Sequence, residues 1–560
     1  MDLGLKRLLI LVLLLQMLHA IDPDGVLHDR SDIFYVNPQA GDIRLRVTRG
    51  AAESAAILIG TQSIEMNLVY QDRNHDYFGV QLNAFDPVLS YRFLLKSGSD
   101  SLMLPPEGSI RPSTDILLTP SWAAGKIYYS INVDGFHNGD PRNDPLDKLA
   151  WGTAPIEWAS YGGDLKGIIQ RIDYINSLGP DIILLSPLFT ATSNHKLNPR
   201  DYTTIDPAYG DTTDLKDLIA AIHGIGKKII LSIVLTHTGN DFPAFADIVA
   251  KGSASRYTDW YRIQAMPSAP GGMTYRSWRA DQRFPLLNLR NAQLQDYLIG
   301  FVDYWAHFGC DGFYIGEGEV DEGFATRLYA RIKEKHPDLL ILYADPRAGS
   351  AYVADGHCNR GFSQLLVDYF INDTLTTAEF DSIIHRMLFF NPAQINRNSI
   401  IATVSHNKRI REVADNELLE LMYAFVFTFC GSPLVFYGDE FGMRECAHLN
   451  WGSFPWSAER QDRSIFSKVQ NLIRIRREND EFSSRSFFTL YIDDVNKVYA
   501  YDRGGMIVVL NCGPIQSFVE LPAWDGTYVE LPGGTKMTAY SHTLKLSVEP
   551  MSYRILKREI

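Results

Sequence analysis

Short hydrophobic stretches separated by Gly, Asn, Asp and Pro fill the chain from residue 21 to residue 122. Clear examples lie at 43–47, 56–59 and 91–95. Stretches of this length, bounded by turn-forming residues, are typical of antiparallel strands. The pattern therefore predicts a small β-sandwich over residues 21–122.

The pattern changes between residues 123 and 486, where strand-length apolar stretches alternate with helix-length segments. Amphipathic stretches at 215–223 and 292–308 have the spacing of helices that bury one face. This alternation predicts an α/β domain of βα units around a parallel sheet. The predicted strands lie at 181–186, 228–235, 312–315, 339–343, 400–404 and 434–437.

Two parts of the chain depart from this alternation. Residues 240–288 form a long irregular insertion, and long insertions in compact domains are usually functional or form a subdomain. Its aromatic residues either pack a small core or form an exposed platform. Residues 487–560 return to short strands and predict a second, C-terminal β-sandwich. The aromatic residues of the insertion include Trp260, Tyr261, Tyr275 and Trp278.

The first twenty residues have the three parts of a secretory signal peptide. Lys6 and Arg7 precede an apolar stretch at 8–15, and small residues end the segment at Ala20. An uncut membrane anchor is the alternative, but Gln16 interrupts the stretch and a bilayer needs about 20 apolar residues. We expect cleavage after Ala20, no membrane span afterwards, and export to the periplasm, the cell surface or the medium.

Composition narrows the class of protein. Hydrophobic residues make up 46% and charged residues 21%, as in folded globular chains. The net charge is −13 and no run of Lys and Arg is present, which argues against a nucleic-acid partner. The five cysteines contain no CxxC pair, so they do not indicate zinc or a redox motif. Cys430 lies in an apolar stretch, as a buried small residue would.

A series of short motifs follows the predicted strands in a fixed order, at 162–165, 184–189, 193–196, 201–207, 223–227, 311–313, 429–433 and 437–440. This series resembles the α-amylase family, glycoside hydrolase family 13, and within it the branch of neopullulanases, cyclomaltodextrinases and maltogenic amylases. The resemblance implies a (β/α)8 TIM barrel over 123–486 with an insertion after its third strand. It also implies a carbohydrate-binding-module or Ig-like sandwich before the barrel and a β-sandwich behind it.

The catalytic positions of that family are not carboxylates in this chain. A retaining glycosidase needs a carboxylate nucleophile and a carboxylic acid about 5–5.5 Å away. At the positions that the resemblance aligns with the family's three catalytic carboxylates, the chain has Gly316, Ala344 and Asn407. None of these side chains can attack an anomeric carbon or protonate a leaving oxygen. The resemblance therefore implies a pseudoenzyme.

Further departures affect the residues around the missing carboxylates. Tyr314 stands where the family has an arginine that orients the nucleophile, and Leu197 stands where it has an aromatic residue that stacks on sugar. The third-strand motif keeps only its histidine, His237. The losses thus extend beyond the reacting groups.

Three acidic residues close to the vacated positions are candidate replacements: Glu317, Glu319 and Asp345. Successive side chains on a strand point to opposite faces, so we expect Glu317 and Asp345 to face the helix layer unless a bulge redirects them. Glu319 lies past the predicted strand end and is the better candidate. An active glycoside hydrolase on α-1,4/α-1,6-glucans that uses displaced carboxylates is therefore the alternative to the pseudoenzyme.

The turn at 138–144 is rich in oxygen-bearing side chains. Ca²⁺ takes six to eight oxygen ligands, although Asn, Asp and Gly are also ordinary turn residues. Related enzymes bind a structural Ca²⁺ with this motif and with a Gly and an Asp of the Gly-Gly-Asp turn. The resemblance thus implies a Ca²⁺ site at Asn138, Asp140, Asn143, Asp144, Gly162 and Asp164.

Several residues of the family's sugar-binding set are kept, namely His195, Tyr202, His237 and His406. The resemblance implies sugar contacts; the alternative is that they pack at strand ends. The leading hypothesis is an exported, non-catalytic barrel related to α-glucan metabolism that binds an α-glucan oligosaccharide or a protein partner at its C-terminal face. A structural subunit of a surface assembly is an alternative, and a homodimer is expected by resemblance.

Overall fold

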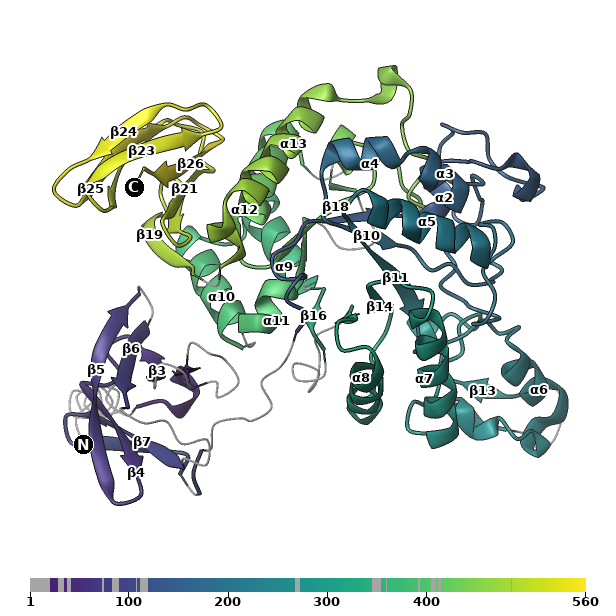
Figure 1. Cartoon of the computed structure of the whole chain (residues 1–560), viewed down its shortest axis with the longest axis horizontal. Coiled ribbons are helices and arrows are strands. Elements are labelled where there is room, and N and C mark those ends of the chain that lie inside the picture. The colour runs from purple at the N-terminus through teal and green to yellow at the C-terminus, as the bar shows by residue number, and fades with distance from the viewer. Residues whose placement is uncertain are drawn as a thin grey trace, which may run out of the picture. The chain divides into compact units, whose positions relative to one another are not determined.

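A computed structural model describes residues 21–559 apart from 29–34, 38–41, 73–74, 83–89, 107, 111–118, 267–271, 345–353, 359, 391–392, 404–408, 411–413 and 485. The predicted signal peptide, Asp345, His406 and Asn407 lie outside the described residues. Contacts divide the chain into two units, Met1–Leu118 with Asp381–Gln394, and Thr119–Phe380 with Ile395–Ile560. Each unit is described by itself (Figure 1).

The first unit is built of antiparallel strands in the order β1-β3-β6-β5-β4-β7-β8, with β2 beside β3. Inward-facing residues such as Ile43, Ile57 and Phe93 are fully buried and form its core. The strands predicted at 43–47, 56–59 and 91–95 are confirmed. The bounds are β1 Val26–Leu27, β2 Val36–Asn37, β3 Asp42–Thr48, β4 Ser54–Ile59, β5 Gln62–Gln71, β6 His75–Gln81, β7 Tyr91–Ser97 and β8 Asp100–Leu104.

The second unit contains a parallel barrel of eight strands in the order β16-β15-β14-β11-β10-β9-β18-β17. A parallel bridge between Cys358, just after β16, and Ile400 of β17 closes the ring. This confirms the (β/α)8 fold. The strands are β9 Tyr128–Ile131, β10 Ile182–Leu185, β11 Lys228–Val234, β14 Gly312–Gly316, β15 Leu340–Tyr343, β16 Gly356–His357, β17 Ile400–Ala402 and β18 Ser432–Phe436.

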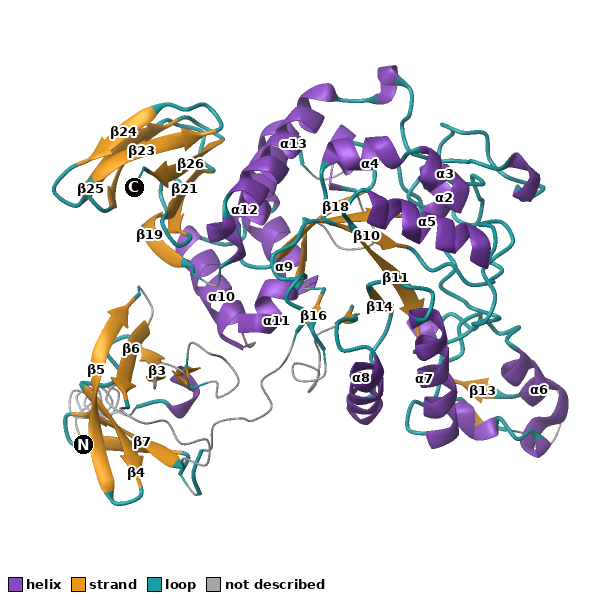
Figure 2. Cartoon of the chain, in the orientation of Figure 1, coloured by secondary structure: helices purple, strands orange, loops and turns teal. Residues whose placement is uncertain are grey.

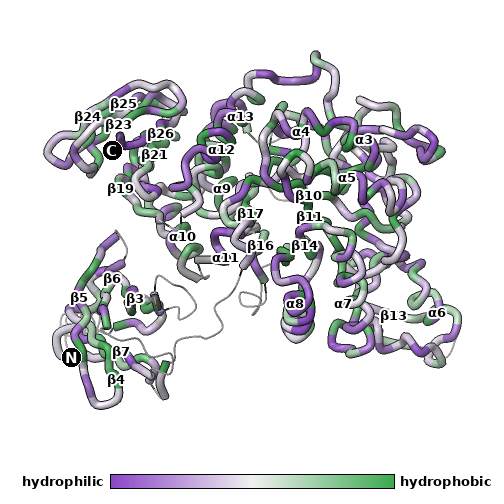
Figure 3. Tube along the Cα trace, viewed as in Figure 1, coloured by the Kyte–Doolittle hydropathy of each residue, from purple (hydrophilic) through white to green (hydrophobic). Residues whose placement is uncertain are grey.

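The barrel strands are apolar along their whole length, as expected when helices cover a parallel sheet. Residues Ile182–Leu185 of β10 are all buried. In Figure 3 the strands β10 and β11 are mostly green, whereas α8 is largely purple. The helices are α2 Val133–Phe136, α3 Leu165–Gln170, α4 Ile172–Leu178, α5 Thr212–Gly224, α6 Pro243–Lys251, α7 Ala292–Ala306, α8 Glu322–Lys335, α9 Arg360–Leu366, α10 Thr377–Phe390, α11 Ala393–Asn398, α12 Asn416–Thr428 and α13 Arg463–Glu478.

Side-chain caps fix where these helices begin. The Asp211 carboxylate accepts the backbone N–H groups of Thr213 and Asp214 in a capping box at α5. The side chains of Asn291 and Asp321 likewise accept backbone N–H groups at the first turns of α7 and α8. Such caps satisfy N–H groups that the first helical turn leaves without partners. None of the helices in the described ranges is both long and apolar enough to cross a bilayer.

The insertion after the third barrel strand forms an ordered subdomain, in keeping with the inserted subdomain expected at about 240–288. It carries α6, a hairpin of β12 Ile263–Ala265 with β13 Thr274–Tyr275, and short 3-10 turns. The ring of Phe245 lies 4.9 Å from the rings of both Tyr261 and Tyr275. These aromatic side chains therefore pack a small core.

The C-terminal segment forms two antiparallel sheets, β19-β20-β21-β26-β23-β24 and β22-β25 (Figure 2). Alternate residues of β22 are buried, so one face of that strand packs on the core. The predicted second β-domain is confirmed. The bounds are β19 Phe488–Asp493, β20 Val498–Asp502, β21 Met506–Asn511, β22 Ser517–Pro522, β23 Gly526–Leu531, β24 Lys536–Ala539, β25 Thr543–Val548 and β26 Ser552–Arg558.

Candidate functional site

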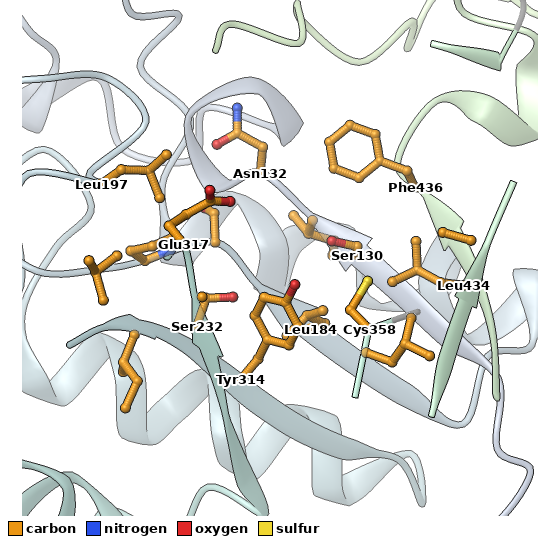
Figure 4. Close-up of a pocket in the computed structure, with 18 of the residues that line it drawn as sticks. Ser130, Asn132, Leu184, Leu197, Ser232, Tyr314, Glu317, Cys358, Leu434 and Phe436 are labelled. Atoms are coloured by element: carbon orange, nitrogen blue, oxygen red, sulfur yellow. The ribbon is translucent and has the colours of Figure 1, made fainter. Parts of the chain in front are cut away.

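A cavity of about 140 Å³ lies inside the C-terminal end of the barrel (Figure 4). Its walls come from β9, β10, β11, β14, β17 and β18, together with Cys358 after β16. In TIM barrels, active sites lie at this end, because the loops after the strands converge there. The cavity is therefore the candidate site.

The position expected to hold a nucleophile is on the wall of this cavity. Gly316 is the last residue of β14 and lines the cavity. A Cβ added to it would meet only ordinary contacts, the nearest being the Tyr314 ring at 3.4 Å. There is thus room for a side chain at Gly316, and its absence contributes to the cavity.

The position expected to hold the acid is closed. Ala344 follows β15, is 1% exposed and belongs to the apolar cluster inside the barrel. Its backbone N–H donates to the carbonyl of Ile315 at 2.9 Å. The structure therefore offers no proton donor at this position.

Glu317 lies where the sequence argument did not expect it. Its side chain is buried and lines the cavity, so the prediction that it faces the helix layer was wrong. The strand ends at Gly316 and Glu317 has a φ of 55°, which breaks the alternation of faces. The Thr236 hydroxyl donates to the Glu317 carbonyl and holds this turn in place.

The surroundings of Glu317 do not supply a second acid. Its carboxylate lies 3.8 Å from the guanidinium of Arg279, which comes from the insertion. Glu319 lies past the strand end, as expected, and is exposed. Among the described residues that line the cavity, Glu317 is the one with a carboxylate.

The retained histidines are buried among aromatic side chains rather than in the cavity wall. His237 is 0% exposed and stacks on Trp278, with ring centroids 4.8 Å apart. The His195 Nδ1 accepts the backbone N–H of Leu197 at 3.1 Å, and its ring contacts Trp158. Burial lowers the pKa of each histidine to about 3, so both rings are neutral at pH 7.

Tyr202 is also used by the fold, since its hydroxyl donates to the Val234 carbonyl at 2.6 Å. Tyr202 is fully buried, and neither it nor the two histidines lines the cavity. An apolar cluster containing Leu197, Trp278 and Phe284 covers this region. In this structure the residues serve packing, and sugar contact at them stays a prediction.

Asn132 is a site residue that the sequence argument missed. It follows β9 directly, lines the cavity and is 3% exposed. It occupies the N-cap position of α2 but makes no capping hydrogen bond. The available signal was a polar residue at the carboxyl end of a barrel strand, where functional groups of TIM barrels gather.

The predicted calcium turn partly fits a cation. The amide oxygens of Asn138 and Asn143 are buried and have no hydrogen-bond partner in the described structure. The Asn138 amide also donates a hydrogen bond to the Asp144 carboxylate. Gly162, which has a φ of 78°, packs against the same carboxylate, since a Cβ at this position would lie 2.5 Å from the Asp144 Oδ1. Orphaned amide oxygens beside a carboxylate are ligands that Ca²⁺ prefers.

The other predicted ligands already have partners. Asp140 pairs with Arg142 at 2.7 Å and with Lys166 at 2.9 Å. Asp164 accepts backbone N–H groups, including that of Gly167 as the N-cap of α3. Lys148 also lies 2.8 Å from Asp144. Asn138, Asn143, Asp144 and Gly162 thus form the part of the set that fits best.

Comparisons with known proteins agree with this architecture. A model of the α-amylase catalytic domain matches residues 130–319. A cyclomaltodextrinase of Thermoanaerobacter pseudethanolicus is 31% identical over 497 residues, which cover 82% of this chain and 86% of that protein. Neopullulanase 2 of Thermoactinomyces vulgaris is 28% identical over 557 residues, which cover 92% of this chain and 95% of that protein.

Solved structures of the same family of enzymes share the fold of this chain. A cyclomaltodextrinase structure superposes with a TM-score of 0.83 at 26% identity, covering 96% of this chain and 100% of that one. A cyclic α-maltosyl-(1→6)-maltose hydrolase of Arthrobacter globiformis gives a TM-score of 0.69 at 25% identity and covers 78% of this chain and all of that one. On the similarity of sequence and fold, this chain belongs to the α-amylase family of glycoside hydrolases, with cyclomaltodextrinases, neopullulanases and maltogenic amylases as its relatives.

Proposed function

We propose that this chain is an exported, non-catalytic member of the α-amylase family whose barrel binds a ligand without cleaving it. The observation that carries the proposal is the pair Gly316 and Ala344, which leaves one carboxylate, Glu317, among the described residues of the cavity wall. Glycoside hydrolysis by retention or by inversion needs two carboxyl groups flanking the bond. The export part rests on the sequence of residues 1–20.

The position of the sugar-binding residues that the resemblance implies supports the same function, because the described ones do not line the cavity. A sugar site needs accurately placed polar groups that can hydrogen-bond the ligand's hydroxyls. Here His237 and Tyr202 are fully buried and bonded or stacked within the fold. We therefore propose that any association with α-glucans, or with a protein partner of their metabolism, is by binding at the C-terminal face.

We further propose a structural Ca²⁺ at the turn of Asn138, Asn143 and Asp144, with Gly162 beside it. The two orphaned amide oxygens support this, because a buried acceptor without a partner is costly and a cation satisfies it. When bound, the ion would tie the loop after β9 to the turn before α3. Its role is structural and lies outside the cavity.

The test is incubation of the purified chain with maltohexaose in calcium buffer, with calorimetry for binding and chromatography for products. We expect intact maltohexaose at the end of the incubation. Release of shorter sugars by the wild type, lost in Glu317→Gln and kept in Glu319→Gln, would overturn the non-catalytic proposal. The Glu319 variant is a matched control because this residue is exposed and lies two positions further on.

A second candidate function has one specific observation in its favour. The turn at Glu317 places a carboxylate inside the cavity, next to the vacated nucleophile position. A displaced-carboxylate hydrolase would use Glu317 and would need a second acid. The Glu317→Gln arm of the experiment therefore separates this alternative from the leading proposal.

A further inference from the structure

The cavity is much smaller than an oligosaccharide site. Its volume is about 140 Å³, and engineered apolar cavities of about 150 Å³ hold one benzene molecule. A ligand that fills this volume is therefore about the size of one six-membered ring.

The inner walls of the cavity are mostly apolar, although the hydroxyls of Ser130, Ser232 and Tyr314 also line it. Leu184, Ile400 and Leu434 line it and belong to, or pack against, the apolar cluster of the barrel interior. Burying the hydroxyl groups of a sugar against such walls would cost free energy, because these few hydroxyls cannot replace all the hydrogen bonds that a sugar makes to water. The walls therefore favour a hydrocarbon body over a sugar ring.

The other end of the cavity offers hydrogen-bond acceptors. Asn132 is 3% exposed and its Oδ1 has no hydrogen-bond partner in the described structure. Its amide N–H donates to the phenol of Tyr437, so the oxygen is the atom left for a ligand. Figure 4 shows the Asn132 amide and the Glu317 carboxylate on the side of the view away from Tyr314 and Cys358.

Glu317 places a carboxyl group at this end of the cavity. It is the one Asp, Glu, Lys, Arg or His among the described residues that line the cavity. Its neighbour Arg279 reaches it from the insertion at 3.8 Å, which is longer than a hydrogen bond, and that arginine is partly exposed. A carboxylate has about four lone-pair sites, so a cation inside the cavity can bind Glu317 alongside the partners that this residue already has.

We propose that the cavity binds a compact primary amine. The ammonium group lies between the Asn132 Oδ1 and the Glu317 carboxylate, and a hydrocarbon body of one ring lies against Leu184, Ile400 and Leu434. An ammonium group donates three hydrogen bonds and accepts none, which matches two facing acceptors. The inference deepens the proposed function and rests on it, because the space at Gly316 is open when that position carries no nucleophile.

The experiment compares three probes that share one ring: cyclohexylamine, cyclohexanol and cyclohexanecarboxylate. Each is titrated into the purified full chain at pH 7.5, with calorimetry and ligand-observed NMR. We expect the amine to bind with one site per chain and at least about tenfold more tightly than the alcohol, since a hydrogen bond to a charged group is worth that factor or more. The carboxylate should show no binding.

The affinities of the probes for three variants test whether binding takes place in this cavity. Glu317→Gln should weaken the amine about tenfold or more and leave the alcohol unchanged, whereas Glu319→Gln should change neither. Gly316→Leu should fill the cavity and abolish binding of both, with its fold checked by circular dichroism. If Gly316→Leu does not fold, Asn132→Leu serves instead and should weaken the amine selectively.

Two results would overturn the inference: equal affinity for the three probes, or amine binding that survives both Glu317→Gln and the cavity variant. These outcomes are distinct from failure of the proposed function, which would show as cleavage of maltohexaose. A chain that cleaves no sugar and binds no amine would refute the ligand class alone.

Discussion

The ring of His237 stacks on the indole of Trp278, with centroids 4.8 Å apart and planes 16° apart. His237 follows the third barrel strand, and Trp278 belongs to the insertion. The contact joins a histidine for which the resemblance implies sugar contact to a residue that covers its ring. His237 is therefore held as a neutral packing residue, and Trp278 of the insertion covers its ring.

Replacing Trp278 by alanine should destabilise the chain by about 3–5 kcal/mol, as expected when a buried tryptophan is truncated. It should also raise the pKa of His237 from about 3 toward its ordinary value of 6.5, because water reaches the ring. Urea unfolding and an NMR titration of the histidine signals measure the two effects. Trp524→Ala is the control, since Trp524 is 70% exposed. Unchanged stability of Trp278→Ala would refute the packing role.

Restoring carboxylates should succeed at one position and fail at the other. Gly316→Asp should cost about 1–2 kcal/mol, because its Cβ has room in the cavity although its carboxylate lies beside Glu317. Ala344→Glu should cost about 3–5 kcal/mol, because it buries a carboxylate without a partner in the apolar interior. Denaturant unfolding compares the two variants. Equal costs would contradict the contrast between an open and a closed position.

Calcium should raise the stability of the chain, and chelation should lower it. At a free Ca²⁺ concentration of about 100 times Kd, binding to the folded state adds about 2.7 kcal/mol. The melting temperature with Ca²⁺ and with EDTA measures this effect. Asn143→Ala and Asp144→Ala should abolish the difference, whereas exposed Asp147→Ala should keep it. A calcium effect that persists in both site variants would place the ion elsewhere.

Stability should fall with rising pH through the titration of Glu440. Burial raises the pKa of this carboxyl from 4.5 to about 7, while hydrogen bonds from the Tyr129 and Tyr174 hydroxyls lower it. Between these two pKa values the folded chain keeps a proton that the unfolded chain has lost. The free energy of unfolding therefore decreases as pH rises from 4.5 to 7, by about 3 kcal/mol from this group.

The variant Glu440→Gln isolates this contribution. An amide cannot ionise and still offers an oxygen to the two tyrosine hydroxyls, so the variant should gain stability relative to wild type by about 3 kcal/mol between pH 4.5 and pH 7. Denaturant unfolding at a series of pH values measures the difference. Glu549 is exposed, so the free energy of unfolding of Glu549→Gln should follow the same pH dependence as that of the wild type. Parallel curves for Glu440→Gln as well would show that this carboxyl does not carry the effect.

Most of the fold could be read from local patterns. The strand predicted at 228–235 is β11, Lys228–Val234, and the helix predicted at 215–223 lies within α5, Thr212–Gly224. These predictions succeed because strand periodicity, helix periodicity and capping residues such as Asp211 act over a few residues. The helix and the hairpin inside the insertion are the exception, because they are held by contacts such as Phe245 with Tyr275, which are remote in sequence.

The candidate site divides in the same way. That Gly316 and Ala344 carry no carboxylate is a property of the residues and needs no structure. The direction of Glu317 did need one, because the alternation rule ends with the strand and a φ of 55° turns the next side chain into the barrel. The role of Asn132 likewise required knowing that its capping position is not used.

The sequence by itself determined the barrel class and the absence of carboxylates at Gly316 and Ala344, because these depend on short-range periodicity and residue type. Only the tertiary structure decided that His237 is sealed beneath Trp278, that Glu317 enters the cavity, and that the cavity has the size of one ring. Those features arise from packing between segments far apart in the chain. The free energy of such packing depends on how side chains fit in three dimensions, which a pattern along one dimension does not record.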